Sequence, residues 1–374
     1  MMNFDLTEEQ KLLKESARNF LSRECPRDLV RTLEEGKEFP PELWRKMTDL
    51  GWTGLIIPGE YGGSGGSFLD LAILFEEIGY HICPGPLFTT VVLGALPVMA
   101  WGTPEQKEDI LPKIAGGERI MTLAVDEPGA YRRASSITAK ASTAGDGFVI
   151  DGTKLFVPDA DRADLLLCAA RTGADEEEIT LFIVEKDAPG ITITPLQTLA
   201  GDRQFEVVFN GVPVKKERIL GEPDRAWPII EDIHRKATVI LCAEMIGGAQ
   251  AVMDMSLEYA RERTQFNRPI GSFQAIQHHF ANMLADISGS RYLFLKAAWK
   301  ISEGRDASMD AAMAKARVGE AYRRVTILGH QIFGGIGFTK EHDMYLYHER
   351  SMTGDLKFGG ADLHRARVAE ELGL

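Results

Sequence analysis

The chain contains few cysteines and no long hydrophobic run. Its four cysteines are scattered, without the CxxC spacing of zinc sites or the density of a disulfide-rich secreted domain. Isolated thiols favour a reducing compartment, so we expect a cytoplasmic protein. The most apolar stretch, near residues 238–243, is far too short to span a bilayer. The first nine residues lack the basic and apolar regions of a signal peptide, and no membrane attachment is expected.

Basic residues are also in the minority. The sequence has 42 Lys and Arg against 55 Asp and Glu, which gives a net charge of −13 at neutral pH. No block of cations is long enough to follow a nucleic-acid backbone, so a nucleic-acid partner is not expected. An anionic small molecule stays possible as a ligand, because it needs only a few local cations.

Several common catalytic motifs are missing. The eight histidines form no HExxH pair and no ligand cluster, so no metal site is expected. A P-loop and a GxGxxG after a strand are both absent, which disfavours ATP and a Rossmann-bound nicotinamide. Residues 62–66 match GxSxG, but a nucleophile elbow needs a strand before the serine and a helix after it. Their glycine-rich surroundings favour a turning loop.

The period of the hydrophobic pattern changes twice along the 374 residues. Helical spacing comes first, with N-cap signals at Thr7 and Thr103. A period of two, typical of strands, then dominates for about a hundred residues before helical spacing returns. The sequence therefore predicts an α+β multidomain fold, with an N-terminal helical domain (1–118), a middle β domain (119–224) and a C-terminal helical domain (225–374).

Two local predictions are specific. Residues 148–157 alternate in polarity around Asp151–Gly152, which predicts a hairpin with its turn at this dipeptide. Residues 238–265 are apolar on more than one face and contain Gly247–Gly248. A helix of this kind is usually buried in a bundle or a subunit interface.

Three segments combine charged, amide and glycine residues. They are Asp126 to Ala130 (DEPGA), Arg263 to Gln274 (RTQFNRPIGSFQ) and Gln331 to Thr339 (QIFGGIGFT). Alone, each is a plain turn, a charged helix end or a glycine-rich helix stop. Together, in this order on an α-β-α chain, they resemble the acyl-CoA dehydrogenase family. The resemblance extends over essentially the whole chain.

The resemblance implies a fold, a reaction and partners. The fold is an N-terminal helical domain, a middle β-barrel domain and a C-terminal four-helix bundle, assembled as a dimer of dimers with FAD bound between subunits. The reaction is α,β-dehydrogenation of an acyl-CoA thioester, with electrons passed to an electron-transfer flavoprotein. Residues 88–92 are implied to line the acyl pocket, where Thr89 and Thr90 are only mildly polar.

The resemblance also assigns residues to the cofactor. They are Val125, Asp126, Val157, Pro158, Arg263, Phe266, Gln274, Gln331, Gly334 and Gly335. The segment 125–127 and the pair 157–158 should face the flavin ring, and the others should serve the FAD of a neighbouring subunit. The residue types fit, because an arginine pairs well with phosphates and glycines let backbone amides approach closely.

The sequence departs from the family at the catalytic base, which takes the α-proton while the β-hydrogen leaves as hydride. In most members the base is a Glu shortly before the last helix. The matching stretch here is 357–360, and Phe358 stands at the Glu position. Other members carry the Glu in the first bundle helix, but residues 236–239 contain no carboxylate. Both usual positions are therefore expected to lack a base.

Many relatives carry a Thr at the position of Asp126, where its hydroxyl bonds the flavin. Asp126 is therefore a candidate either for a different bond to the flavin or for a displaced base. Its alternative is a carboxylate in a turn. Weaker candidates are Asp355, Asp362, Glu349 and Glu244. Three interpretations follow: an active dehydrogenase with an unusual base or one from another chain, a non-catalytic subunit of a mixed oligomer, or a flavoenzyme doing different chemistry on a CoA ester, such as 1,4-elimination on a cyclic substrate.

Overall fold

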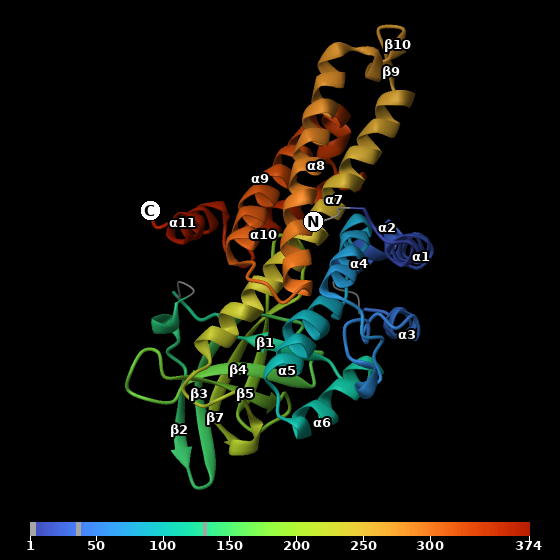
Figure 1. Ribbon diagram of the computed structural model, residues 1–374. Coiled ribbons are helices and arrows are strands. Elements are labelled where there is room, and N and C mark those ends of the chain that lie inside the picture. Colours follow the sequence, from blue (N-terminus) through green and yellow to red (C-terminus); the bar gives the residue numbers. More distant parts are fainter. Residues whose placement is uncertain (1–4, 35–38, 130–132) are drawn as a thin grey trace. The chain divides into compact units, whose positions relative to one another are not determined.

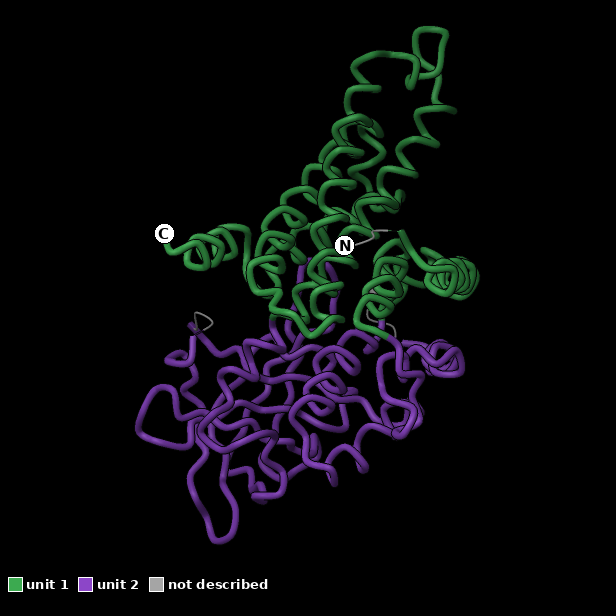
Figure 2. Tube along the Cα trace, viewed as in Figure 1, with its two compact units in different colours: residues 1–37, 67–84, 235–374 green, residues 38–66, 85–234 purple. Residues whose placement is uncertain are grey.

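The computed structural model describes residues 5–34, 39–129 and 133–374 (Figure 1). Residues 1–4 of the polar N-terminus and Ala130 of the DEPGA segment lie outside the described residues. The chain divides into two compact units, each built from separated segments (Figure 2). Unit 1 comprises residues 1–37, 67–84 and 235–374, and unit 2 comprises residues 38–66 and 85–234.

Unit 1 is built from helices. They are α1 (Glu8–Glu24), α2 (Arg27–Glu34), α4 (Phe68–His81), α8 (Gln274–Ser302), α9 (Ser308–Phe333), α10 (Met344–Leu356), α11 (Ala361–Glu371) and most of α7 (Trp227–Glu262). The hairpin of β9 (Thr264–Gln265) and β10 (Arg268–Pro269), followed by η5 (Ile270–Ser272), joins α7 to α8. The 3-10 helix η6 (Gly334–Phe338) follows α9. Figure 1 shows the hairpin beyond the ends of the long helices α7 and α8.

Two glycines let α4 and α7 approach closely within unit 1. A Cβ added at Gly79 would lie 1.8 Å from the carbonyl oxygen of Glu244, and one added at Gly247 would lie 1.8 Å from that of Glu76. No side chain fits at either position, which explains a glycine inside so apolar a helix. The expectation that the most apolar stretch is too short to span a bilayer is wrong, because α7, among the helices in the described part of the chain, is long and apolar enough to cross a membrane. However, 72% of its most apolar window is buried. It therefore matches the predicted core helix.

Unit 2 contains a mixed sheet. Its strands are β1 (Met121–Ala124), β2 (Lys140–Ala144), β3 (Gly147–Pro158), β4 (Leu165–Arg171), β5 (Ile179–Glu185), β6 (Ile191–Leu196), β7 (Gln204–Lys215) and β8 (Ile219–Leu220). Their order is β6-β7-β3-β2-β4-β5-β8, and β1 pairs with β4 in parallel. Phe182, Phe205 and Phe209 lie in the buried core of this sheet.

Helices accompany the sheet in unit 2. They are α3 (Pro41–Asp49), α5 (Leu96–Trp101), α6 (Pro104–Ala115), the π-helix η2 (Phe88–Ala95) and the short 3-10 helices η1 (Gly59–Tyr61), η3 (Ala134–Ser136) and η4 (Lys216–Arg218). Both predicted N-caps are confirmed, because Thr7 and Thr103 form reciprocal capping boxes with Gln10 and Gln106. The helical, sheet and helical order confirms the predicted fold class. The boundaries at 118 and 224 stay a prediction.

The predicted turn at Asp151–Gly152 is wrong. β3 runs through this dipeptide, and the chain reverses at residues 144–147 instead, between β2 and β3. Gly152 has a φ of 153° and lies at an irregularity in the pairing of β3 with β7. The Asp151 carboxylate accepts a 2.8 Å hydrogen bond from the backbone amide of Gly211. Pairing with β7 therefore determines the conformation of this dipeptide, since an Asp-Gly pair suits a bulge as well as a turn.

Candidate functional site

The predicted flavin-facing residues of unit 2 lie together. Val125 and Asp126 follow β1, and Val157 and Pro158 end β3. The backbone amide of Leu155 donates a 2.8 Å hydrogen bond to the carbonyl of Asp126, which joins the two segments. Both valines are buried and Asp126 is half-buried. The structure therefore brings together the two segments that the resemblance implies should face the flavin ring, and their role in binding stays a prediction.

A buried ion pair fixes the segment after β1. Nζ of the fully buried Lys154 donates to Oε1 of Glu127 (2.5 Å) and to the carbonyl of Val125 (3.3 Å). Oε2 of Glu127 accepts from the amide and hydroxyl of Thr138 (2.8 and 2.5 Å), and Oε1 also accepts from the amide of Ala139 (3.1 Å). Burial alone would raise the pKa of Glu127, but Lys154 and Thr138 outweigh it and hold this pKa below its usual value. Both carboxylate oxygens are satisfied, so the pair holds the backbone of 125–127.

Asp159, directly after Pro158, is a second buried acid. Its φ of 50° lies in the left-handed region, and its Oδ2 accepts a 2.6 Å hydrogen bond from the hydroxyl of Thr89 in η2. Burial raises the pKa of this carboxyl, although Thr89 and Arg162 oppose the rise. The strand end that should face the flavin is therefore tied to a helical segment implied to line the acyl pocket.

One group of predicted residues in unit 1 lies on the exposed hairpin. Arg263 follows α7, Phe266 stands at the tip, and Gln274 begins α8. Phe266 and Asn267 are the two turn residues, with φ of 53° and 62°, and the Phe266 side chain is 88% exposed. The amide of Ile270 donates to the carbonyl of Arg263 (2.8 Å) and closes the hairpin. An exposed aromatic residue held in left-handed backbone favours a contact surface.

A second exposed group ends α9. Gln331 lies in its last turn, Gly334 stops the helix with a φ of 66°, and Gly335 follows in η6. A Cβ added at either glycine would meet no atom within 4 Å, so the space beside both is open, and the backbone amide of Gly334 donates to the carbonyl of His330. The rings of Tyr259 and Phe333 lie 4.7 Å apart, which brings the ends of α7 and α9 together. The two groups of predicted residues therefore share one end of unit 1.

The loop expected to carry the catalytic base is held in place by buried side chains. Phe358 is half-buried and has a φ of 56°, and its carbonyl lies 3.1 Å from Nε2 of His364. Nζ of the fully buried Lys315 donates to the carbonyls of Asp355 and Gly359, both at 2.8 Å. The loop thus has a defined conformation, and it presents a phenyl ring where the resemblance expects a carboxylate.

Of the weaker base candidates, Asp355 and Asp362 contact arginines, whereas Glu349 lies in α10 and Glu244 in α7. Oδ2 of Asp355 accepts from Arg323 (3.3 Å), and the exposed Asp362 pairs with Arg365 (3.2 Å). Burial raises the pKa of Glu349, although neighbouring cations oppose the rise. The contacts of the two aspartates favour structural roles for them.

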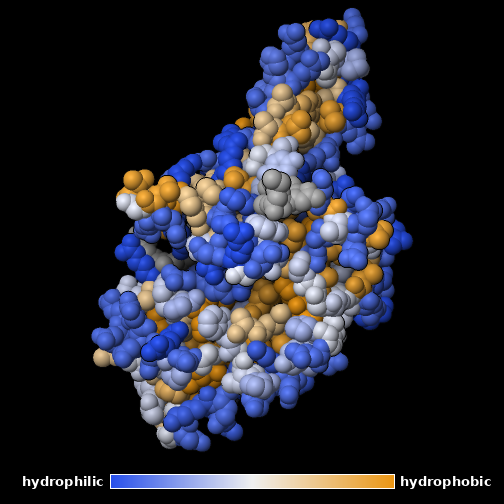
Figure 3. Space-filling view, in the orientation of Figure 1, coloured by the Kyte–Doolittle hydropathy of each residue, from blue (hydrophilic) through white to orange (hydrophobic). Residues whose placement is uncertain are grey.

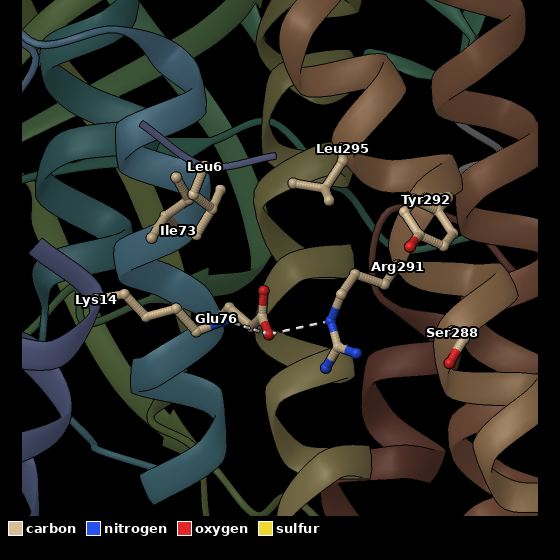
Figure 4. A pocket seen from close by; sticks show the side chains of 8 residues that line it. All are labelled: Leu6, Lys14, Ile73, Glu76, Ser288, Arg291, Tyr292 and Leu295. Atoms are coloured by element: carbon tan, nitrogen blue, oxygen red, sulfur yellow. Dashed lines mark hydrogen bonds and ion pairs between the residues drawn. The ribbon is translucent and has the colours of Figure 1, made fainter. Parts of the chain in front are cut away.

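A pocket of about 170 Å³ lies elsewhere in unit 1 (Figure 4). It is lined by Leu6, Lys14, Ile73, Glu76, Ser288, Arg291, Tyr292 and Leu295. Oε1 of Glu76 accepts from Lys14 (2.9 Å) and from Arg291 (3.2 Å), so its charge is balanced by the pocket's own cations. The predicted site residues do not line this pocket, and we assign it no part in their chemistry.

Three family models match the chain. They describe the N-terminal, middle and C-terminal domains of acyl-CoA dehydrogenases, and they match residues 7–118, 122–212 and 230–373. The chain belongs to the acyl-CoA dehydrogenase family. It is 34% identical to a probable acyl-CoA dehydrogenase, YngJ, of Bacillus subtilis, over 99% of this chain and 100% of that protein.

Solved structures agree with this assignment. Butyryl-CoA dehydrogenase from Megasphaera elsdenii is 28% identical, with a TM-score of 0.95 over 100% of both chains. A chain in a structure described as the electron transferring flavoprotein of Acidaminococcus fermentans is 30% identical, with a TM-score of 0.92 over 99% of both chains. The predicted family, fold and type of reaction are thereby confirmed, and this acyl-CoA dehydrogenase-family chain is a flavoprotein oxidoreductase.

FAD is the cofactor of this family member, and the predicted residues fit its chemistry. Buried Val125 and Val157 suit the neighbourhood of a flat apolar ring, and the exposed guanidinium of Arg263 suits a pyrophosphate. The open space beside Gly334 and Gly335 suits the close approach of a cofactor to the backbone.

The sequence did not reveal two parts of this site. Lys154 lies in an alternating strand, where a lone lysine is typical of a solvent-facing position. Asp159 follows a strand, where an aspartate is typical of a turn. The partner of Lys154, Glu127, lies 27 positions away in the chain, so no local pattern shows their contact.

Proposed function

We propose that this protein is an FAD-dependent acyl-CoA dehydrogenase that removes the α- and β-hydrogens of an acyl-CoA thioester and passes electrons to an electron-transfer flavoprotein. The observation that carries the proposal is the junction of segment 125–127 with segment 155–158, locked by Glu127 and Lys154 in a chain that matches this family throughout. We place the protein in the cytoplasm, because its four cysteines are free and buried.

The chain's own residues would bind and orient the reactants. Bound flavin supplies an acceptor for hydride. Glu127 and Lys154 hold the flavin-facing backbone in place before substrate arrives, so little reorganisation is needed during the reaction. Arg263 would pair with a cofactor phosphate, and the open space beside Gly334 and Gly335 would let polar cofactor atoms approach the backbone. Asp126 would take the α-proton as the displaced base.

We further propose that the protein assembles as a dimer of dimers and that unit 1 completes the cofactor site of a second copy. Its predicted residues are all exposed, as expected of a surface that awaits a partner. Large apolar side chains are also exposed on the same helices, including Leu284 (51%) and Tyr292 (53%) of α8. Figure 3 shows hydrophobic residues gathered on the long helices below the hairpin. Contiguous apolar surface of this kind marks protein interfaces.

A second candidate function is a non-catalytic subunit in a mixed oligomer. The specific observation in its favour is the loop after α10, which has a defined conformation and carries Phe358. A phenyl ring cannot accept a proton, and residues 236–239 offer no carboxylate either. Such a subunit would bind cofactor or substrate for a different, catalytic chain.

An anaerobic flavin-bleaching assay separates these candidates. The purified protein is mixed with straight-chain, branched, cyclic and steroid-like acyl-CoAs while the flavin absorbance is recorded. We expect bleaching with at least one of them, and we expect Asp126→Asn to slow it by about a hundredfold or more, as loss of a general base does. Asp146→Asn, which changes an exposed acid of the same unit, should bleach like the wild type.

Each other outcome has a defined meaning. Bound flavin that no acyl-CoA bleaches would contradict the dehydrogenase proposal and support the non-catalytic subunit. A cyclic product of 1,4-elimination would show that the protein is a flavoenzyme with different chemistry on a CoA ester, the third interpretation given under the sequence analysis. Wild-type rates in Asp126→Asn would show that the base lies elsewhere.

A further inference from the structure

Two functional segments of unit 2 meet at one hydrogen bond. Asp159 follows Val157–Pro158, which should face the flavin, and Thr89 lies in η2, which is implied to line the acyl pocket. The Thr89 hydroxyl donates to Oδ2 of Asp159 at 2.6 Å, and both residues are buried. A buried hydrogen bond to a carboxyl is a strong restraint, because neither group has water as an alternative partner.

The Asp159 side of this contact is held by backbone hydrogen bonds. Its amide donates to the carbonyl of Arg203 (3.2 Å), and its carbonyl accepts from the amide of Arg162 (3.0 Å). The carbonyl of the preceding Pro158 accepts a 2.6 Å hydrogen bond from the hydroxyl of Thr122 in β1. The carboxyl group therefore projects from a fixed point at the end of β3.

The Thr89 side is a π-helix, a wide winding that is rare and often occurs at functional sites. Its packing against β1 is tight, since a Cβ added at Gly94 would lie 2.8 Å from the Met121 side chain. The buried hydroxyl of the next residue, Thr90, has no hydrogen-bond partner among the described residues. The Thr89 hydroxyl, in contrast, ties this part of η2 to the strand end.

We propose that Asp159 is a positioning residue, which through Thr89 sets the place of η2 relative to the flavin-facing strand end and thereby the length of acyl group that the enzyme accepts. The inference rests on the proposed function. The Thr89–Asp159 hydrogen bond carries it, because a shift of η2 would change the depth of the acyl pocket that the resemblance implies it lines, while the strand end stays fixed.

The role needs a hydrogen-bond acceptor and no charge. The charged groups near the carboxyl are Arg162, Asp161 and Arg203, of mixed sign, and burial favours the neutral form of Asp159. An amide oxygen accepts the same hydrogen bond from Thr89. Asp159→Asn should therefore preserve the function that Asp159→Ala removes, and Thr89→Ser should preserve what Thr89→Val removes.

The test compares acyl chain-length profiles. KM and kcat are measured for straight-chain acyl-CoAs of increasing length in Thr89→Val, Asp159→Ala, the double variant and the two conservative variants. We expect both disruptive variants to shift the preferred length and to raise KM for the wild-type optimum about tenfold, as loss of one buried hydrogen bond predicts, with a smaller change in kcat. The double variant should be no worse than either single one, because both remove the same contact.

Thr172→Val supplies a matched control for structural damage. Thr172 donates to the Asp224 carboxylate in the same unit, so its removal also breaks a Thr–Asp hydrogen bond. This variant should lower the thermal midpoint without moving the preferred length. Flavin affinity is measured in every variant by fluorescence titration, and we expect it to stay within a few-fold of the wild type because the strand end is held by its own backbone contacts.

An unchanged length profile in Thr89→Val and Asp159→Ala, with only a lower thermal midpoint, would overturn the inference. Additive effects in the double variant, or failure of Asp159→Asn to restore the profile, would overturn it as well. If the wild-type protein bleaches with no acyl-CoA, the proposed function fails and this inference fails with it. Bleaching combined with an unchanged profile rejects the inference alone.

Discussion

The predicted cofactor residues of the two units contrast in burial and support. In unit 2 Val125 and Val157 are buried, Asp126 and Pro158 are half-buried, and an ion pair and backbone hydrogen bonds hold their segments within one chain. In unit 1 they are exposed on a hairpin tip and a glycine-rich helix end. The residues of unit 2 are therefore positioned by the folding of the chain, whereas those of unit 1 form an exposed surface that functions only on contact with a ligand or a second chain. Substitutions in unit 2 should therefore lower the free energy of unfolding, and substitutions in unit 1 should lower the affinity for FAD.

The largest expected effect is in unit 2. Lys154→Met leaves the Glu127 carboxylate buried without its cation, which typically costs about 3–5 kcal/mol of unfolding free energy. Urea unfolding monitored by fluorescence measures the loss. Lys140→Met removes an exposed lysine from the same sheet and should change stability by about 0.5 kcal/mol or less. Equal stability of the two variants would show that the buried pair is not needed to hold the segment.

The second-largest expected effect is a difference between the two units in the pH range over which acid lowers their stability. Burial lowers the pKa of His81 in α4 to about 4 from an ordinary 6.5, so the folded unit 1 binds this proton less readily than the unfolded chain. Its stabilising contribution is complete above pH 6.5 and is lost as the pH falls toward 4. The pKa of Glu127 lies below its ordinary 4.5, so its contribution to unit 2 is lost only in stronger acid.

Hydrogen exchange at pH 7 and pH 5, corrected for intrinsic rates, measures this difference. Amides of α4 should lose protection at pH 5 while amides of β3 keep theirs. His81→Gln should reduce the loss in α4, because its amide does not titrate in this range. Equal loss in both elements would contradict the separation of the two pH windows.

A moderate effect on affinity is expected in unit 1. Arg263→Ala removes a charge-assisted hydrogen bond to the cofactor and should weaken FAD binding by about tenfold or more. Because the side chain is exposed, the stability of the cofactor-free protein should hardly change. Arg261→Ala, at the exposed end of the same helix, controls for the loss of positive charge. Equal FAD dissociation constants in both variants would remove Arg263 from the site, and Gln274→Ala tests the other end of the hairpin in the same way.

The last prediction compares alanine substitutions at two adjacent glycines, Gly334 and Gly335, in thermal stability and FAD affinity. Gly334 has a φ of 66° and a ψ of −142°, so Gly334→Ala should cost about 1–3 kcal/mol of backbone strain. Gly335→Ala meets open space and has no positive φ, so the protein without cofactor should tolerate it. If the backbone here contacts FAD, both variants should bind FAD more weakly, although only Gly334→Ala lowers the thermal midpoint. Normal FAD affinity in Gly335→Ala would argue against that contact.

Patterns that depend on neighbours in the sequence were predictable. The N-caps at Thr7 and Thr103 depend on residues within a few positions, and they were predicted correctly. The prediction of a turn at Asp151–Gly152 was wrong because pairing with a distant strand determines the conformation of this dipeptide. Lys154 and Asp159 were missed for the same reason, since their partners lie far away in the chain. Phe358 was noticed only because a resemblance supplied the residue to expect there.

The contact of α4 with α7 limits how this chain can be recombined with its relatives. Gly79 and Gly247 each face a carbonyl group of the opposite helix at a distance that admits no Cβ. Neither helix can accept a larger residue there unless the other moves. A chimera with a related protein should therefore take residues 67–84 and α7 from the same parent.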